Sequence, residues 1–97
     1  MLNNQNSWSE WFDFKRSVLS DMPQTEGVFM MHSAMKILFI EGTTNLKKSI
    51  EEKFNHPEIT ENTRLRFMMT QTYEKTAEEL IKDYRIRHNG KNPLCMK

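Results

Sequence analysis

The chain has 97 residues, 37% of them hydrophobic, and a formal net charge of +1. This length excludes two separate cores, because each would have too little chain to bury one, so we expect a single domain over residues 1–97. The near-neutral charge favours neither a nucleic-acid partner nor its absence. The single Cys95 excludes an internal disulfide, which fits a reducing compartment.

The sequence has no apolar run long enough to span a bilayer, and residues 1–6 are polar rather than signal-like. We therefore expect a soluble cytoplasmic protein without a membrane partner.

The first predicted element is a helix over about residues 8–22. Ser7 followed by Glu10 forms a capping box at its start. Pro23 ends it, because the residue before a proline avoids helical geometry. The apolar residues between them recur at helical spacing: Trp8, Phe12, Leu19 and Met22.

Two short strands are predicted next, over residues 27–32 and 36–41. Both segments are rich in aromatic and aliphatic residues, and Ser33-Ala34-Met35 joins them. Two such runs with a short connection are typical of a β-hairpin.

A second helix follows, with Thr43 or Thr44 as its cap and Leu46, Ile50 and Phe54 on one face. Residues 55–57, Asn-His-Pro, end this helix. A third strand is predicted within residues 65–72.

The last predicted helix covers Tyr73 to His88 and ends at Asn89-Gly90, followed by an irregular tail over residues 91–97. These elements predict an α+β fold: a small three-stranded antiparallel sheet flanked by helices, with an extra N-terminal helix.

Two segments resemble the signature strands of the GIY-YIG nuclease family. Residues 22–29 resemble its lead-in, with a proline shortly before Gly27-Val28-Phe29 and Phe29 at the first tyrosine. Residues 38–41, Leu-Phe-Ile-Glu, resemble the second signature, with Phe39 at its tyrosine and Glu41 at its glycine. The resemblance covers about residues 22–90 and implies the fold of that family.

Residues 45–50 follow at the family's spacing and place Ser49 at its catalytic arginine, with Lys53 where a further tyrosine or histidine is common. The last helix is similar to the one that bears the family's metal-binding glutamate. Asn89 matches the family's asparagine, and counting back from it places the glutamate position on Ala77. In a shifted register, the flanking Glu74 or Glu78 would replace that glutamate.

The resemblance implies metal-dependent DNA cleavage, but the residues do not fit that chemistry. Such cleavage needs a base, a cation for the phosphate and a metal. Phe29 and Phe39 have no hydroxyl. Ser49 cannot replace a guanidinium, and Ala77 cannot bind a metal. We therefore expect a catalytically inactive domain with no metal, cofactor or small-molecule substrate.

Three functional hypotheses follow. The first is a nucleic-acid-binding or regulatory module that contacts DNA or RNA through a set of cations: Lys47, Lys48, Lys53, Arg85, Arg87 and Lys91. These cations could equally be solvated helix faces and helix ends. A basic ridge continuous across the last two helices would favour this hypothesis.

The second hypothesis is a protein-interaction or homodimerisation module, in which the helix from Trp8 to Met22 presents an apolar surface. The third is a divergent metal-dependent endonuclease with Glu78 and His32 in new roles.

Overall fold

The fold is α+β, built on one antiparallel sheet with helices on both faces. A computed structural model describes residues 7–33, 36–57, 59, 62–93 and 96. The strands are β1 (Phe12–Asp13), β2 (Gly27–Ser33), β3 (Lys36–Thr43) and β4 (Arg64–Met69), in the order β1-β4-β2-β3. The expected sheet of three strands thus gains a fourth, β1.

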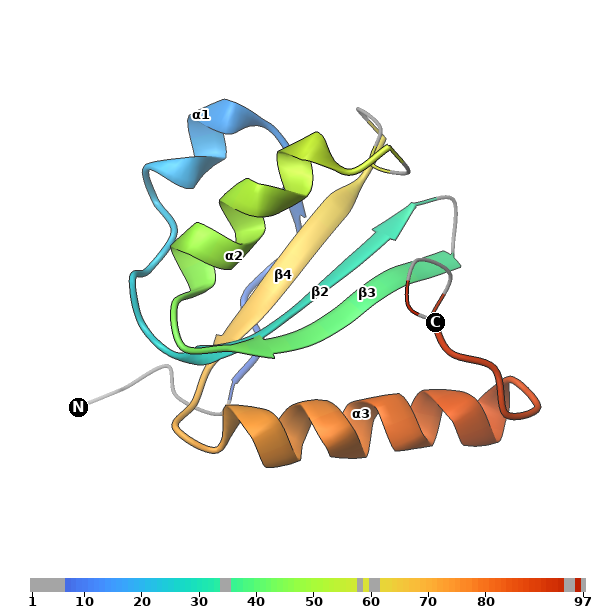
Figure 1. Ribbon diagram of the computed structural model, residues 1–97. Coiled ribbons are helices and arrows are strands. Elements are labelled where there is room, and N and C mark those ends of the chain that lie inside the picture. Colours follow the sequence, from blue (N-terminus) through green and yellow to red (C-terminus); the bar gives the residue numbers. More distant parts are fainter. Residues whose placement is uncertain (1–6, 34–35, 58, 60–61, 94–95, 97) are drawn as a thin grey trace.

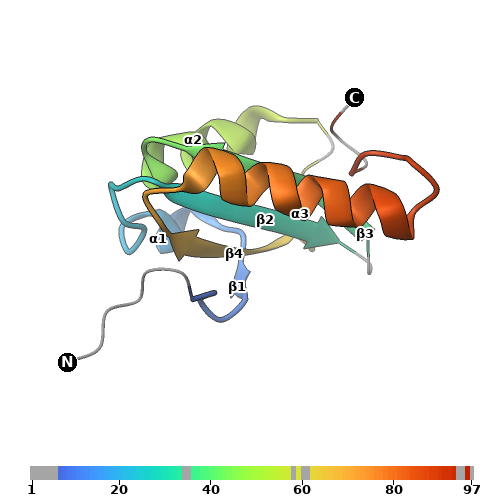
Figure 2. The same ribbon diagram turned by 90° about the horizontal axis from the view of Figure 1, so that it is seen from below.

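Three helices flank the sheet: α1 (Arg16–Leu19), α2 (Leu46–Glu52) and α3 (Tyr73–Arg87), with a 3₁₀ turn, η1 (Lys53–Asn55), continuing α2. Helices α1 and α2 lie on one face of the sheet, and α3 lies across the other (Figure 1). Seen from the α3 side, α3 runs along the sheet over β2 and β3 (Figure 2).

Strand β2 lies in the middle of the sheet and is buried from Gly27 to Met31. It pairs with β3 along one edge and with β4 along the other. Because strand side chains alternate, Phe29 and Met31 point to the α2 face, whereas Val28 and Met30 point to the α3 face. A strand that is apolar at every position is what two covered faces require.

Each face of the sheet has its own core. The larger lies under α1 and α2 and consists of Phe14, Met22, Phe29, Met31, Leu38, Phe39, Leu46, Ile50 and Leu65. The smaller lies under α3 and consists of Val28, Met30, Ile40 and Ala77. The two cores share no buried residue, so the sheet separates two distinct environments.

The predicted helix over residues 8–22 is wrong for most of its length, since only α1 is helical there. Residues 9–14 instead run along the outer edge of β4. The Ser9 N–H donates to the Phe67 carbonyl (2.8 Å), the Ser9 hydroxyl accepts from the Phe67 N–H (3.0 Å), and the Phe14 N–H donates to Thr63 (2.9 Å). These hydrogen bonds satisfy backbone groups at the edge of β4, which would stay unpaired if residues 9–14 were helical.

Side-chain packing supports the same extended path. Phe12 stacks on Phe67, with ring centroids 6.1 Å apart, and Phe14 stacks on Phe54 at 4.1 Å. Both rings therefore face the α2 core. Residues two apart share a face in a strand but not in a helix, so this packing indicates an extended chain.

The predicted second helix forms as α2, but its cap is Asn45 rather than Thr43 or Thr44. The Asn45 Oδ1 accepts a hydrogen bond from the Lys48 N–H (3.1 Å), which satisfies a free donor of the first turn. The Leu46 N–H donates to the Thr25 carbonyl (2.9 Å), which ties the start of α2 to the segment that precedes β2.

The predicted last helix is confirmed as α3, and its stop lies at Asn89-Gly90. Both residues have positive φ, 57° and 84°, and the Gly90 N–H donates to the Arg85 carbonyl (2.7 Å). Residues 34–35 of the predicted hairpin turn and Cys95 lie outside the described residues.

Gly27 permits the closest approach between β2, β4 and α2. A Cβ at this position would overlap the Met68 carbonyl oxygen and lie 2.8 Å from the Leu46 Cδ1. We predict that Gly27→Ala lowers the free energy of unfolding by about 2 kcal/mol or more, because backbone cannot move aside cheaply. Urea unfolding followed by circular dichroism measures this.

The control is Ser17→Ala on the exposed surface of α1, which should change stability by less than about 0.5 kcal/mol. Equal stability of Gly27→Ala and the unmodified protein would contradict this packing.

Candidate functional site

The two phenylalanines at the family's tyrosine positions lie together in the core under α2. Phe29 is fully buried and Phe39 is 5% exposed. Phe29 pairs with Glu41 in the β2–β3 register, so Phe29, Phe39 and Glu41 share one face of the sheet.

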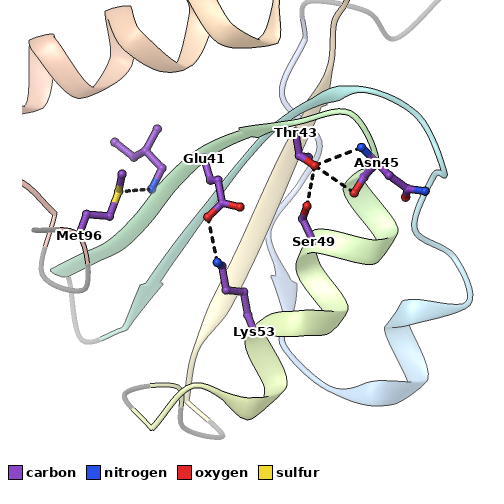
Figure 3. A network of polar contacts seen from close by, with 7 residues as sticks. Glu41, Thr43, Asn45, Ser49, Lys53 and Met96 are labelled. Atoms are coloured by element: carbon purple, nitrogen blue, oxygen red, sulfur yellow. Dashed lines mark hydrogen bonds and ion pairs between the residues drawn. The ribbon is translucent and has the colours of Figure 1, made fainter.

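Lys53 of η1 lies over both rings and reaches Glu41 (Figure 3 shows the ion pair). Its Nζ lies 2.9 Å from the Glu41 Oε1, 4.5 Å from the Phe39 ring centroid and 5.9 Å from that of Phe29. The Lys53 side chain is 17% exposed and that of Glu41 35%. This ion pair is thus partly desolvated, and the rings add a cation–π attraction to it.

Ser49, at the family's arginine position, is bonded to the loop before α2. Its Oγ lies 2.5 Å from the Thr43 Oγ1, which also accepts from the Asn45 N–H (3.1 Å; Figure 3). The hydroxyl therefore holds the start of α2 to the end of β3, a role that needs no charge.

Ala77, at the family's glutamate position, lies on the opposite face of the sheet. It is buried in the core under α3, where a Cβ on Gly42 would approach its Cβ to 3.2 Å. Glu74 and Glu78 are exposed on the same helix. Neither register of α3 therefore places a carboxylate beside Phe29, Phe39 and Ser49.

The six candidate cations divide into two separate groups. Lys47, Lys48 and Lys53 belong to α2 and η1, whereas the second group lies at the end of α3 or just after it: Arg85, Arg87 and Lys91. The α2 group lies on one face of the sheet and the α3 group on the other, with α2 starting at the end of the molecule opposite to where α3 stops (Figure 1). The structure contains no basic ridge that runs across both helices within its described residues.

Several of these cations already have partners. The Arg85 Nε donates to the Asn92 Oδ1 (2.6 Å), and Arg87 pairs with Asp83 at 3.2 Å. The Arg87 pair is solvent-exposed and therefore weak. Asn89, the match to the family's asparagine, forms the turn after α3 rather than a site.

A cavity that the sequence analysis did not predict lies between the C-terminal half of α3 and the sheet. It has a volume of about 340 Å³, and its polar and aromatic lining includes Trp11, His32, Arg66, Tyr84, Arg87 and His88. These residues come from the segment before β1, from β2, from β4 and from α3 and the turn that follows it, so only the folded chain brings them together.

Arg66 is the central cation of this cavity. Its Cζ lies 4.4 Å from the Trp8 ring centroid and 4.7 Å from that of Trp11. Its Nε is buried and has no hydrogen-bond partner among the described residues. Burial lowers the pKa of the Arg66 guanidinium, which nevertheless stays charged in proteins. Two indole rings, rather than a carboxylate, thus hold this charge.

The imidazoles of the cavity are held against aromatic rings. His32 meets Trp11 edge-on, with centroids 4.2 Å apart. Burial lowers the pKa of His32, and the nearby charges of Arg64 and Arg66 lower it further, so the ring is neutral at neutral pH. Tyr84 and His88 stack at 3.8 Å.

One signal in the sequence could have indicated this cluster. Arg64 and Arg66 alternate with Leu65 and Phe67, and strand periodicity places both arginines on the face opposite the larger core.

Across the described ranges, no three His, Cys, Asp or Glu side chains gather closely enough to hold a metal ion. No helix in that part of the chain is both long and apolar enough to cross a bilayer.

Comparison with known proteins assigns no family: no family model, curated protein or solved structure matches the chain. The resemblance to GIY-YIG domains therefore depends on the residues and the order of the elements alone.

The Lys53–Glu41 pair should couple measurably in a double-mutant cycle. For Lys53→Met and Glu41→Gln we expect a coupling free energy of about 1 kcal/mol, because the pair is partly desolvated. The matched control is the exposed Asp83–Arg87 pair, for which we expect about 0.3–0.5 kcal/mol. Urea unfolding of each set of four proteins measures both values, and an equal or smaller coupling at Lys53–Glu41 would refute the effect of partial desolvation.

His32 should titrate below the ordinary imidazole value of 6.5. Since the unfolded chain binds the proton more readily, the free energy of unfolding should fall as pH drops through about 6.5. His32→Gln should remove this part of the pH dependence. NMR titration of the imidazole resonances tests the shift. Asp83 and Arg87 of α3 are further charged groups that line the cavity beside His32. A midpoint at or above 6.5 would contradict the lowered pKa.

Proposed function

We propose that this chain is a catalytically inactive GIY-YIG-like domain that binds nucleic acid without cutting it. The observation that carries the loss of catalysis is the Lys53–Glu41 pair, which lies on the buried rings of Phe29 and Phe39.

The order of elements supports the GIY-YIG-like architecture. After β1 and α1, the chain continues as β2, β3, α2, β4 and α3, which is the order that the resemblance implies. The two signature segments form the hairpin of β2 and β3, and α2 follows directly.

The chemistry of the α2 face supports inactivity. Hydrolysis of a phosphodiester needs a base, a cation that grips phosphate and a metal that stabilises the leaving oxygen. On this face Phe29 and Phe39 supply no proton acceptor, Ser49 is bonded to Thr43, and Lys53 is paired. Ala77 lies across the sheet from all of them.

The charges at the end of the α3 face support a nucleic-acid partner. Five cations lie on β4, at the end of α3 or just after it: Arg64, Arg66, Arg85, Arg87 and Lys91. Two carboxylates, Asp13 and Asp83, pair with Arg64 and Arg87 in exposed positions. Cations beside aromatic rings are typical of surfaces that bind nucleic-acid strands.

The alternative is a homodimerisation or protein-interaction module, and one observation supports it. Strand β3 is an edge strand, and its Ile40 N–H points out of the sheet to the Met96 Sδ at 3.3 Å, a weak acceptor that a partner strand could replace. The N-terminal helix expected to present the apolar surface forms only as α1, and Trp8 and Trp11 lie outside it and pack on Arg66.

We predict that the purified protein leaves plasmid DNA, single-stranded DNA and RNA intact in the presence of Mg²⁺ or Mn²⁺. It should nevertheless shift at least one of these in a binding titration. Because few cations take part, the logarithm of the binding constant should fall with the logarithm of the salt concentration with a slope of about −2 to −4.

Two results would overturn this proposal. Metal-dependent cleavage that disappears in Glu78→Ala would establish the divergent endonuclease. No binding to any nucleic acid, together with a dimer mass by light scattering, would establish the interaction module instead.

A further inference from the structure

The Arg66 side chain is half-buried, and its guanidinium has unusual surroundings for a charged group. Its Nε is buried without a hydrogen-bond partner, and no carboxylate pairs with it among the described residues. An unsatisfied buried donor is costly, and a buried charge without a counterion more so. Such a group, at the wall of a cavity, is suited to an anion that comes from outside the chain.

The charges around the cavity favour the same kind of ligand. Arg87 and Asp83 of α3 line it together with Arg66, while Arg64 lies next along β4 on the same face. Asp83 offsets one of these cations, since it pairs with Arg87 at 3.2 Å, and Asp13 offsets another, since it pairs with Arg64 at 3.3 Å. The balance is still cationic. Burial lowers the pKa of His32, and the charges of Arg64 and Arg66 lower it further.

The rest of the lining is aromatic. Trp11 lies on one side, and the stacked rings of Tyr84 and His88 come from α3 and the turn after it. Aromatic side chains beside arginine are what bind unpaired bases, because every base offers a π-face and its phosphate offers a charge.

The size of the cavity limits what can enter. Its volume of about 340 Å³ lies at the small end of ligand sites, which range from about 300 to 1,000 Å³. A single base with its phosphate fits this range, whereas a base inside a duplex is paired and stacked and cannot enter.

From these features we infer that the cavity under the C-terminal half of α3 binds one unpaired nucleotide of a single-stranded nucleic acid. The phosphate binds to Arg66 and Arg87, and the base lies against Trp11 and the Tyr84–His88 stack. This inference rests on the proposed function, and it places the binding site on the α3 face, away from the motif residues on the α2 face.

The test is a titration of fluorescein-labelled single strands of about ten nucleotides, as RNA and as DNA, followed by anisotropy. Arg66→Gln should weaken binding by about tenfold or more, because it removes a desolvated charge from the phosphate. The matched control is Lys48→Gln on the exposed surface of α2, which should stay within about twofold of the unmodified protein. A duplex of the same sequence should bind more weakly than either strand.

Two further variants keep the test valid if Arg66→Gln does not fold. Arg87→Gln and His88→Ala change exposed side chains at the end of α3, so circular dichroism should show only a small change in melting temperature. Each should still weaken single-strand binding, by about threefold to tenfold. An excess of adenosine monophosphate should compete only weakly, since it offers no neighbouring phosphates.

The outcomes separate this inference from the proposed function. If a single strand binds but no cavity variant weakens it, the inference is wrong and the proposed function stands. The inference is also wrong if the duplex binds better than either single strand. If no nucleic acid binds, both are wrong.

Discussion

Strand β2 is buried on both faces and hydrogen-bonded along both edges, and this constraint determines where the other groups lie. Phe29 and Met31 must face one core, and Val28 and Met30 the other. Helix α2 follows β3 onto the first face, and α3 follows β4 onto the second. The sheet therefore separates the positions of β2, β3 and α2 that resemble the GIY-YIG motif from the one in α3.

The two faces differ in what they can do. On the α2 face the polar groups pair with one another: Lys53 with Glu41, and Ser49 with Thr43. On the α3 face, Arg66 is held by indole rings and its Nε stays without a partner in the described structure. Satisfied polar groups stabilise a fold, whereas an unsatisfied cation beside a cavity is suited to a ligand. This contrast is the reason to look for binding under α3.

Much of the fold could be predicted from the sequence, because local patterns determine it. The strands over residues 27–32 and 36–41 are short runs rich in aromatic and aliphatic residues, and the stop at Asn89-Gly90 depends on left-handed backbone. Both features can be read directly from the sequence. The path of residues 9–14 could not be predicted in the same way. Their helical spacing is real, but hydrogen bonds to the edge of β4, distant in sequence, outweigh it.

The candidate site shows the same division between local and distant causes. The absence of hydroxyls at Phe29 and Phe39 could be read from the sequence alone. The Lys53–Glu41 pair and the cavity could not, since each joins residues from elements that meet only after folding. The position of Ala77 likewise follows from the face on which α3 packs, which helical periodicity does not determine.

The most direct test of the account is to map binding by NMR, with a short single-stranded oligonucleotide added to isotope-labelled protein. The account predicts that the largest shifts fall on the Trp11 indole, Arg66 and His88, while Ser49 and Lys53 on the α2 face stay unchanged. Shifts centred on Ser49 and Lys53, with none at Arg66, would contradict it.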